Sequence, residues 1–131
     1  MTLADACQAI ADILAAALGE DWSCYPNIEP TFTPPAVFVL DPIRWENDRD
    51  FEQAIRIALP VRYTVPAGSY RDSRIQLSEA LVTGKNALDA SINLNGAVEA
   101  LWVPRVENFG NYRTNDGLVY YAAEQHVEFM I

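Results

Sequence analysis

The chain has 131 residues, of which 50% are hydrophobic and 21% charged, so we expect one globular α+β domain over residues 1–131 and no disordered chain. Nine basic and eighteen acidic residues give a formal net charge of -9, which argues against broad binding to nucleic-acid phosphates. No apolar run approaches the ~20 residues of a membrane span, and the N-terminus lacks the early basic residues of an export signal. No membrane partner is therefore expected.

The first predicted element is an amphipathic helix. Apolar residues recur at spacings of three and four as far as Leu18, Thr2 with Asp5 resembles a capping box, and Gly19 supplies a stop. Residues 22–28 follow as a short strand, which Pro26 marks as irregular or at an edge.

Two stretches in the middle of the chain have strand patterns. Residues 36–40 form a continuous apolar run, which predicts a strand buried on both faces. Residues 51–65 alternate between an apolar face and a charged or small face, and at roughly 3.3 Å per residue this strand would span on the order of 45 Å. Such a strand outreaches the core of a small domain, so its excess length is expected to need a partner. Residues 43–50 between the two stretches predict a charged loop.

The second half of the chain predicts two helices and two strands. A helix begins near Ser69 or Asp72 and is interrupted at Gly84, and residues 86–93 look like a shorter third helix. Residues 98–106 and 118–131 predict strands, and the Gly, Asn and Asp content of residues 107–117 is typical of a hairpin loop.

The order of these elements predicts the fold class. Strands joined by short connections usually pair antiparallel, and helices need a sheet face to cover. We therefore expect an α+β fold with an antiparallel or mixed sheet of about four strands. The N-terminal helix and the central helix pair should lie on one face of that sheet.

No catalytic, metal-binding or cofactor-binding site is predicted, so the chain is not expected to be an enzyme. His126 is the only histidine, and its alternation with Val127 predicts a solvated or interface side chain that points away from the core. Cys7 and Cys24 are expected to be reduced and buried. The acidic run in residues 41–52 lacks the glycine of a calcium-binding loop.

Large aromatic residues in otherwise polar stretches are the better functional signal. Trp45 lies in the stretch 43–50, and Phe109 and Tyr112 lie in the stretch 107–117. Rings in wet loops often anchor a partner, and the alternative is that they fold back onto their own sheet. With their charged neighbours they form a candidate subunit or partner interface of Arg44, Trp45, Asp48, Phe109, Tyr112 and Arg113.

Several short motifs, taken with the element order, resemble a known family. The chain resembles the small tail terminator, or tail completion, proteins of long-tailed bacteriophages, especially those of actinobacterial hosts, over nearly its whole length. The motifs are YPN at 25–27, TPPAVFV at 33–39, ALDASI at 87–92, GAVEALWV at 96–103 and VEF at 127–129.

The resemblance implies a homo-oligomeric ring, usually a hexamer, at the head-proximal end of the virion tail, formed during assembly in the host cytoplasm. Such a ring ends polymerisation of the tail tube and presents the head-joining surface. Its implied partners are the tail tube protein, a head-proximal neck protein and DNA that passes without specific binding, and no cofactor or enzyme activity is implied. A head-closure or connector subunit would look similar. A small-molecule-binding or peptide-binding α+β module is the alternative from another class.

Overall fold

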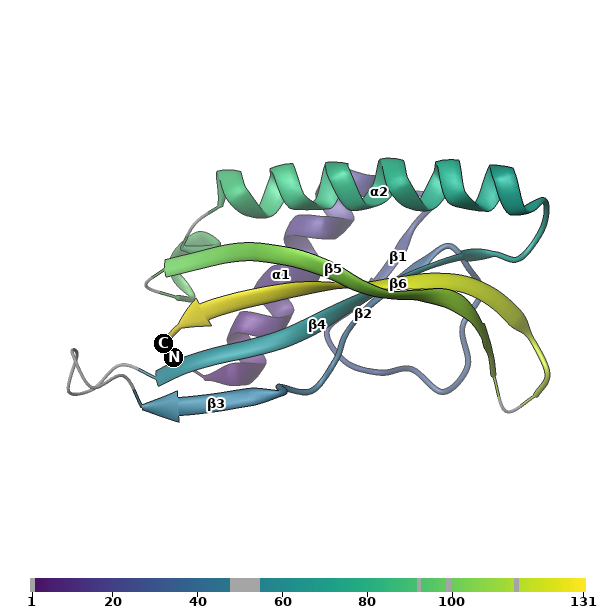
Figure 1. Cartoon of the computed structure of the whole chain (residues 1–131). Helices are drawn as coiled ribbons and strands as arrows, with labels where there is room; N and C mark the ends of the chain where they lie inside the picture. The colour runs from purple at the N-terminus through teal and green to yellow at the C-terminus, as the bar shows by residue number, and fades with distance from the viewer. Residues whose placement is uncertain (1, 48–54, 92, 99, 115) are drawn as a thin grey trace.

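The computed structural model of this protein describes residues 2–47, 55–91, 93–98, 100–114 and 116–131. It has two layers, with the helices on one face of a twisted sheet, as Figure 1 shows. The predicted α+β class is confirmed. The described sheet is mixed and has six strands, rather than about four.

The first helix, α1, spans Leu3–Leu18 and follows the sequence prediction closely. The Thr2 hydroxyl accepts from the Asp5 amide at 3.2 Å, and the Asp5 carboxylate accepts from the Thr2 amide at 3.0 Å. This reciprocal pair satisfies two backbone donors that a helix start leaves without partners. Gly19, at a φ of 90°, ends the helix in a conformation that favours glycine.

The central strand of the sheet is β4, which pairs with three other strands. The sheet order is β1-β2-β4-β6-β5, and β3 also pairs with β4. Strands β2 and β3 follow one another along the same edge of β4, and only the β1–β2 pair is parallel. The strands are β1 (Ser23–Tyr25), β2 (Ala36–Val39), β3 (Arg44–Asn47), β4 (Ile55–Pro66), β5 (Ala100–Arg113) and β6 (Val119–Met130).

The predicted loop at residues 43–50 is wrong for its first half. Arg44–Asn47 form strand β3, which pairs antiparallel with the first part of β4. Residues 48–54, which include the predicted start of the long strand, lie outside the described residues. All four residues of β3 are exposed, so the strand has no apolar alternation for a sequence pattern to detect.

The predicted helix pair is also wrong, because α2 is one continuous helix, Tyr70–Ala90. Gly84 does not interrupt it but lies buried where the helix crosses the sheet. A Cβ at this position would lie 2.9 Å from Cζ of Tyr63 and 3.1 Å from Cδ2 of Leu14. The glycine therefore permits close packing of helix and sheet, and a short 3-10 turn, Leu94–Gly96, follows the helix.

The predicted hairpin loop at 107–117 is largely strand. β5 runs through Pro104 and Gly110 to Arg113, and the connection to β6 is confined to residues 114–118. Two register shifts interrupt its pairing with β6, and Asn108 has a φ of 60° beside the second. These bulges let an edge strand accommodate a proline and turn-forming residues that would interrupt a regular ladder.

The face of the sheet under the helices, called here the helix face, holds the main core. It is built from alternate residues of β4 and β6 together with one side of each helix. One polar chain crosses this core: the Tyr63 hydroxyl donates to the Gln125 side chain at 2.7 Å, and Gln125 donates to the Leu81 carbonyl at 3.0 Å. The largest fully buried side chains on this face include Ile10, Leu14, Ile57, Leu59, Val61, Tyr63, Leu77, Leu88 and Phe129.

Candidate functional site

The structure divides the predicted interface residues between the two opposite edges of the sheet. Arg44 and Trp45 lie on β3 at one edge, whereas Phe109, Tyr112 and Arg113 lie on β5 at the other. Figure 1 shows β3 at the bottom of the sheet and β5 next to α2. Asp48 lies outside the described residues. The described ones among the predicted residues therefore lie at two separate edges of the sheet, and Arg113 lines a hollow beside Arg62 and Tyr120 rather than the surface that holds Phe109.

The first surface is the β3 edge, defined here as residues 43–47. Trp45 is 53% exposed and Ile43 is 60% exposed. Trp45 lies opposite Ile57 in the strand register, so its ring is on the helix face, beyond the region that the helices cover. Arg44 is on the other face, with Nε 3.5 Å from Glu46 and an amino group 3.9 Å from Glu128.

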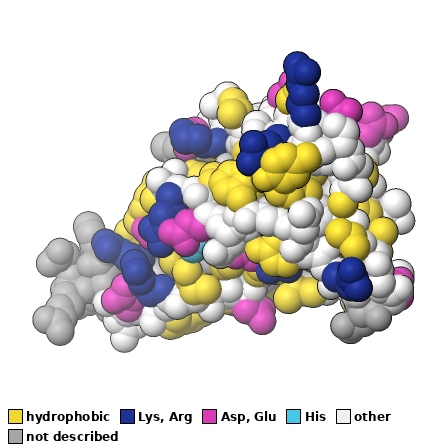
Figure 2. Space-filling view, turned by 45° about the vertical axis from the view of Figure 1, so that its right-hand side comes forward, with side chains coloured by type: hydrophobic (Ala, Val, Ile, Leu, Met, Phe, Trp, Pro, Cys, Tyr) yellow, Lys and Arg dark blue, Asp and Glu magenta, His cyan; other side chains and the backbone are white. Residues whose placement is uncertain are grey.

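The second surface is the α2–β5 groove, an open hollow of about 340 Å³ between the first half of α2 and β5. Tyr70 and Phe109 are both more than half exposed at the groove. Figure 2 shows hydrophobic side chains gathered in the upper middle of this side of the molecule, with basic side chains against them. The groove is lined by Tyr70, Arg74, Leu77, Ser78, Phe109, Gly110, Asn111 and Tyr121.

Arg74 supplies the positive charge of the α2–β5 groove. Its guanidinium stacks 4.2 Å from the centre of the Tyr70 ring and donates to the Tyr70 hydroxyl at 2.7 Å. Hydrogen bonding to Tyr121, and then to Tyr70, raises the pKa of Arg74 above its ordinary value. In the part of the chain that the structure describes, no carboxylate lies within 4 Å of this guanidinium. The groove thus offers aromatic surface beside a cation that has no ion pair with any described residue.

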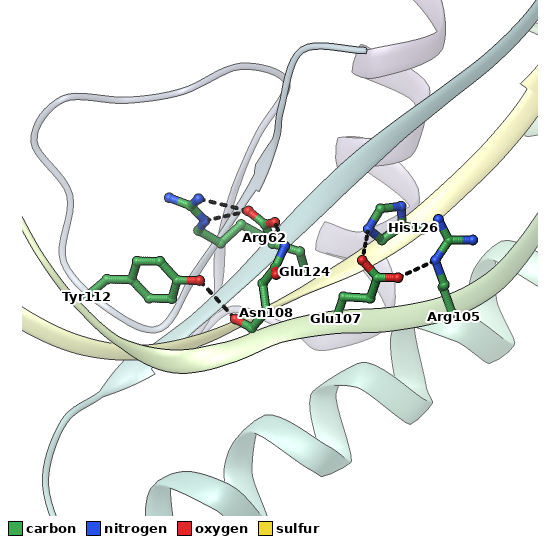
Figure 3. A network of polar contacts seen from close by, with 7 residues as sticks. All are labelled: Arg62, Arg105, Glu107, Asn108, Tyr112, Glu124 and His126. Carbon is green, nitrogen blue, oxygen red and sulfur yellow. Dashed lines mark hydrogen bonds and ion pairs between the residues drawn. The ribbon is translucent and has the colours of Figure 1, made fainter. Parts of the chain in front are cut away.

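The opposite side of the sheet, called here the network face, carries buried charges (Figure 3). Arg62 on β4 donates twice to one oxygen of Glu124 on β6, at 2.8 and 3.1 Å, and Asn108 on β5 donates to the other oxygen at 2.6 Å. Burial alone would lower the pKa of Arg62, but the hydrogen bond and charge of Glu124 raise it. The net change is therefore a raised pKa. This network joins three strands, so it stiffens the sheet.

A chain of aromatic rings covers the same face next to the charges. The connection before β2 folds Phe32 against Phe38 and Tyr120, with ring centres 4.6 and 5.1 Å apart. Tyr120 in turn stacks on Tyr112 at 5.7 Å, and the Arg62 guanidinium lies 4.8 Å from the centre of the Tyr112 ring. For Tyr112 the structure therefore shows the alternative arrangement, in which the ring packs on its own sheet. Phe109 remains exposed.

His126 lies on the network face, as its alternation with Val127 predicted, but the expectation that it is solvated is wrong. The residue is 5% exposed. Its Nε2 lies 3.4 Å from a Glu107 oxygen, without hydrogen-bond geometry, and Arg105 donates to the other Glu107 oxygen at 2.5 Å. The ladder places Arg105 opposite His126 and Glu107 opposite Glu124, so β5 brings charged side chains over β6. The sequence pattern predicted this strand only as far as residue 106, so it did not indicate that the rest of β5 would lie beside β6 and bury His126.

In the described ranges, the two cysteines have raised pKa values and the possible metal ligands form no close group. Cys7 and Cys24 are half-buried, and burial raises the pKa of each thiol to about 11, which leaves little thiolate at neutral pH. Among the described residues, no group of three or more His, Cys, Asp or Glu side chains could hold a metal ion. No helix in the described ranges is both long and apolar enough to cross a bilayer.

Comparison with known proteins adds no relative: no protein-family model matches this chain, and no curated protein is detectably similar to it in sequence.

Proposed function

We propose that this chain is an assembly subunit of a bacteriophage tail, and specifically a tail terminator. In this role, copies of the chain form a ring on the head-proximal end of the tail tube in the virion, end tube polymerisation and present the surface that joins the head. The proposal starts from the resemblance in motifs and element order. It also needs support from the geometry of the molecule.

The supporting observation is that two different surfaces lie at opposite edges of one rigid sheet. A ring built head to tail requires two unlike, complementary patches on each subunit. The β3 edge presents Trp45 and Ile43, and the α2–β5 groove presents Phe109 and Tyr70. Exposed large apolar side chains that lie close together are typical of binding surfaces.

The network face suits a protein that acts through shape. A ring on a tube must keep its form while other proteins bind both of its ends. The contacts among Arg62, Glu124 and Asn108 join β4, β6 and β5. Such a network resists changes in the twist of the sheet, and with it changes in the angle between its two edges.

The net charge of -9 supports a bore through which DNA passes without binding. Asp and Glu side chains lining the bore would repel the phosphates of the passing DNA. A structure of the assembled ring tests this point directly, since a bore lined mainly by Lys and Arg would contradict it.

The decisive experiment for the function is a tube-length assay. Tail tube protein from the same phage is polymerised with and without this chain, and tube lengths are measured by electron microscopy. A terminator shortens the tubes, and density for a ring appears at one end only. The variant Ile28→Asp should shorten the tubes as the native chain does, because Ile28 is 59% exposed and lies on neither the β3 edge nor the groove. It is the control for variants at those two surfaces. Unchanged tube lengths at excess protein contradict the proposal.

A second candidate, a peptide-binding module, is favoured by the α2–β5 groove itself. Its volume of about 340 Å³ is at the lower end of the roughly 300–1,000 Å³ typical of ligand pockets. The groove is open and is bounded by an unpaired strand, which suits an extended peptide better than a compact small molecule. A chain that leaves tube length unchanged but binds one peptide from a random library in this groove would favour this candidate. A head-closure or connector subunit would instead bind neck proteins and not the tube.

A further inference from the structure

Charge is distributed unevenly along the chain. The first 47 residues, which supply α1, β1, β2 and β3, contain seven acidic residues and one basic residue. Residues 55–131, which supply β4, α2, β5 and β6, contain eight acidic and seven basic residues. The sheet order sets β3 and β5 at opposite edges. The part of the chain that supplies β3 is therefore acidic, while Arg74 beside β5 has no carboxylate within 4 Å among the described residues.

Both edges offer backbone for pairing. Within the described residues, β3 pairs only with β4 and β5 pairs only with β6, so each has an unpaired outer edge. The two bulges distort β5 up to Gly110, but residues 110–113 are in regular register with β6. This regular segment has four residues, and β3 also has four. An unpaired regular edge is a template for another strand.

The side chains at the two edges lie on the same face of the sheet. Trp45 is on the helix face, since it lies opposite Ile57, and Ile43 precedes it by two residues. The α2–β5 groove is also on the helix face, because α2 forms one wall and Tyr121 lines it from the helix side of β6. A sheet that continues from β5 of one copy into β3 of another would therefore place Trp45 and Ile43 beside the groove.

We propose that the α2–β5 groove binds the β3 edge of a second copy of this chain. In this contact β3 of the second copy extends the sheet alongside residues 110–113, and its Trp45 ring lies in the groove beside Phe109 and Tyr70. The first 47 residues of that copy carry a net negative charge, which favours their approach to Arg74. The contact is head to tail, so each copy keeps one free surface of each kind, and repetition closes a ring if the rotation permits. The inference deepens the proposed function and rests on it for the ring.

Two variants that each block one surface test the pairing. Trp45→Asp disables the β3 edge, and Phe109→Asp disables the groove. Both side chains are more than half exposed, so both variants should fold. Ile28→Asp is the matched apolar-to-acid control away from both surfaces. Circular dichroism and thermal melting confirm folding, and light scattering after size exclusion gives the mass at the highest concentration reached.

The expected result is complementation. The native chain and Ile28→Asp self-associate, and each edge variant alone has an association constant lower by about tenfold or more, as for loss of a hot-spot ring. An equimolar mixture of Trp45→Asp and Phe109→Asp forms a dimer, because one intact groove meets one intact β3 edge. Association of the native chain weakens as salt rises, and Arg74→Gln reduces that salt dependence.

Three results would overturn the inference. The first is self-association of either edge variant alone at the level of the native chain, which would indicate a contact that does not use that surface. The second is a mixture of folded variants that stays monomeric although the native chain associates. The third is a native chain that is monomeric at every concentration tested. In each case the tube-length assay remains informative, since a folded edge variant that still shortens tubes would leave the proposed function standing without this interface.

Discussion

The two faces of the β4–β6 strand pair are buried by different means. On the helix face, α1 and α2 cover aliphatic and aromatic side chains, and the Tyr63–Gln125 pair is a small polar exception. On the network face none of the described helices covers the sheet, and burial comes from Phe32, from the side chains of β5 and from paired charges. Glu124 is nevertheless only 7% exposed.

The difference shows which face depends on specific hydrogen-bond and ion-pair partners. Apolar packing is less directional than hydrogen bonding, so the helix face tolerates apolar substitutions that keep its volume. A buried carboxylate needs specific hydrogen-bond donors, and Glu124 receives them from Arg62 on β4 and Asn108 on β5. The network face is therefore the more specific of the two, and the sheet geometry that separates the β3 edge from the groove depends on it.

The largest expected effect comes from removing the carboxylate of the network face. Glu124→Ala leaves the Arg62 guanidinium without its ion partner. Because the Arg62 side chain keeps 27% exposure, we expect a loss of about 2–3 kcal/mol in unfolding free energy, below the range for fully buried pairs. The double variant Arg62→Leu with Glu124→Leu should recover most of this, to within about 1 kcal/mol of the native chain. Urea unfolding measures both. A single variant as stable as the native chain would show that the pair does not support this face.

A smaller loss is expected from overpacking the helix face. Gly84→Ala gains about 1 kcal/mol in helix propensity but introduces a methyl group against Tyr63 and Leu14, at a cost of roughly 1–3 kcal/mol. The net result should be a loss of about 1 kcal/mol, read from thermal or urea unfolding. Thr83→Ala on the exposed side of the same helix is the control, with a change within about 0.5 kcal/mol. If Gly84→Ala stabilised the protein, the helix face would be less tightly packed than its contacts indicate.

Replacing the two aromatic residues of β5, Tyr112 and Phe109, should have different effects on the free energy of unfolding. Tyr112→Ala loses the stacking on Tyr120 and the contact with Arg62, so the unfolding free energy should fall by about 1 kcal/mol. Phe109→Ala should change it by less than about 0.5 kcal/mol, because the ring is exposed, while it weakens assembly. Equal losses for both variants would mean that Phe109 also packs on the domain in solution.

The smallest expected effect is a dependence of the unfolding free energy on pH, which arises from the thiols of Cys7 and Cys24 at the rim of the helix face. Burial raises the pKa of Cys7 and Cys24 to about 11, above the value of 9.0 usual for a thiol. Below pH 9 the thiols are neutral in both states, so their contribution to stability is fully present. It is lost as pH rises from about 9 to 11, because only the unfolded thiols ionise there.

The check is urea unfolding between pH 8 and 11 for the native chain and for Cys7→Ala with Cys24→Ala. The decline should be shallower in the variant. Burial, and to a smaller extent Cys24, also raise the pKa of Tyr63. Both proteins contain that tyrosine and bury it, so the larger part of its effect is common to the two curves. Identical slopes would show that the thiols are not held in the neutral form by the fold.

Local sequence patterns determined those elements whose apolar residues are periodic or continuous along the chain. The capping box and apolar spacing predicted α1, the apolar run predicted β2, and the strict alternation in residues 51–65 and 118–131 predicted the faces of β4 and β6. Side chains meet the helix-face core at every third or fourth residue of α1 and at every second residue of β4 and β6, whereas every residue of β2 is buried. Each of these contact patterns is visible in the sequence as a spacing of apolar residues.

Only the tertiary structure decided the edges and the crossings. β3 and the second half of β5 are edge strands in which many side chains meet water, so their sequences read as loops. From sequence alone Gly84 predicts a helix break, whereas in the structure it allows the helix to pack on Tyr63. From sequence alone His126 predicts a solvated or interface side chain, whereas β5 pairs beside it and buries it. These outcomes depend on residues far away in the chain, and no local pattern encodes such a neighbour. The alternation of β4 and β6 was set by the sequence itself, whereas the two exposed edges that carry the proposed function arise only when the strands pair.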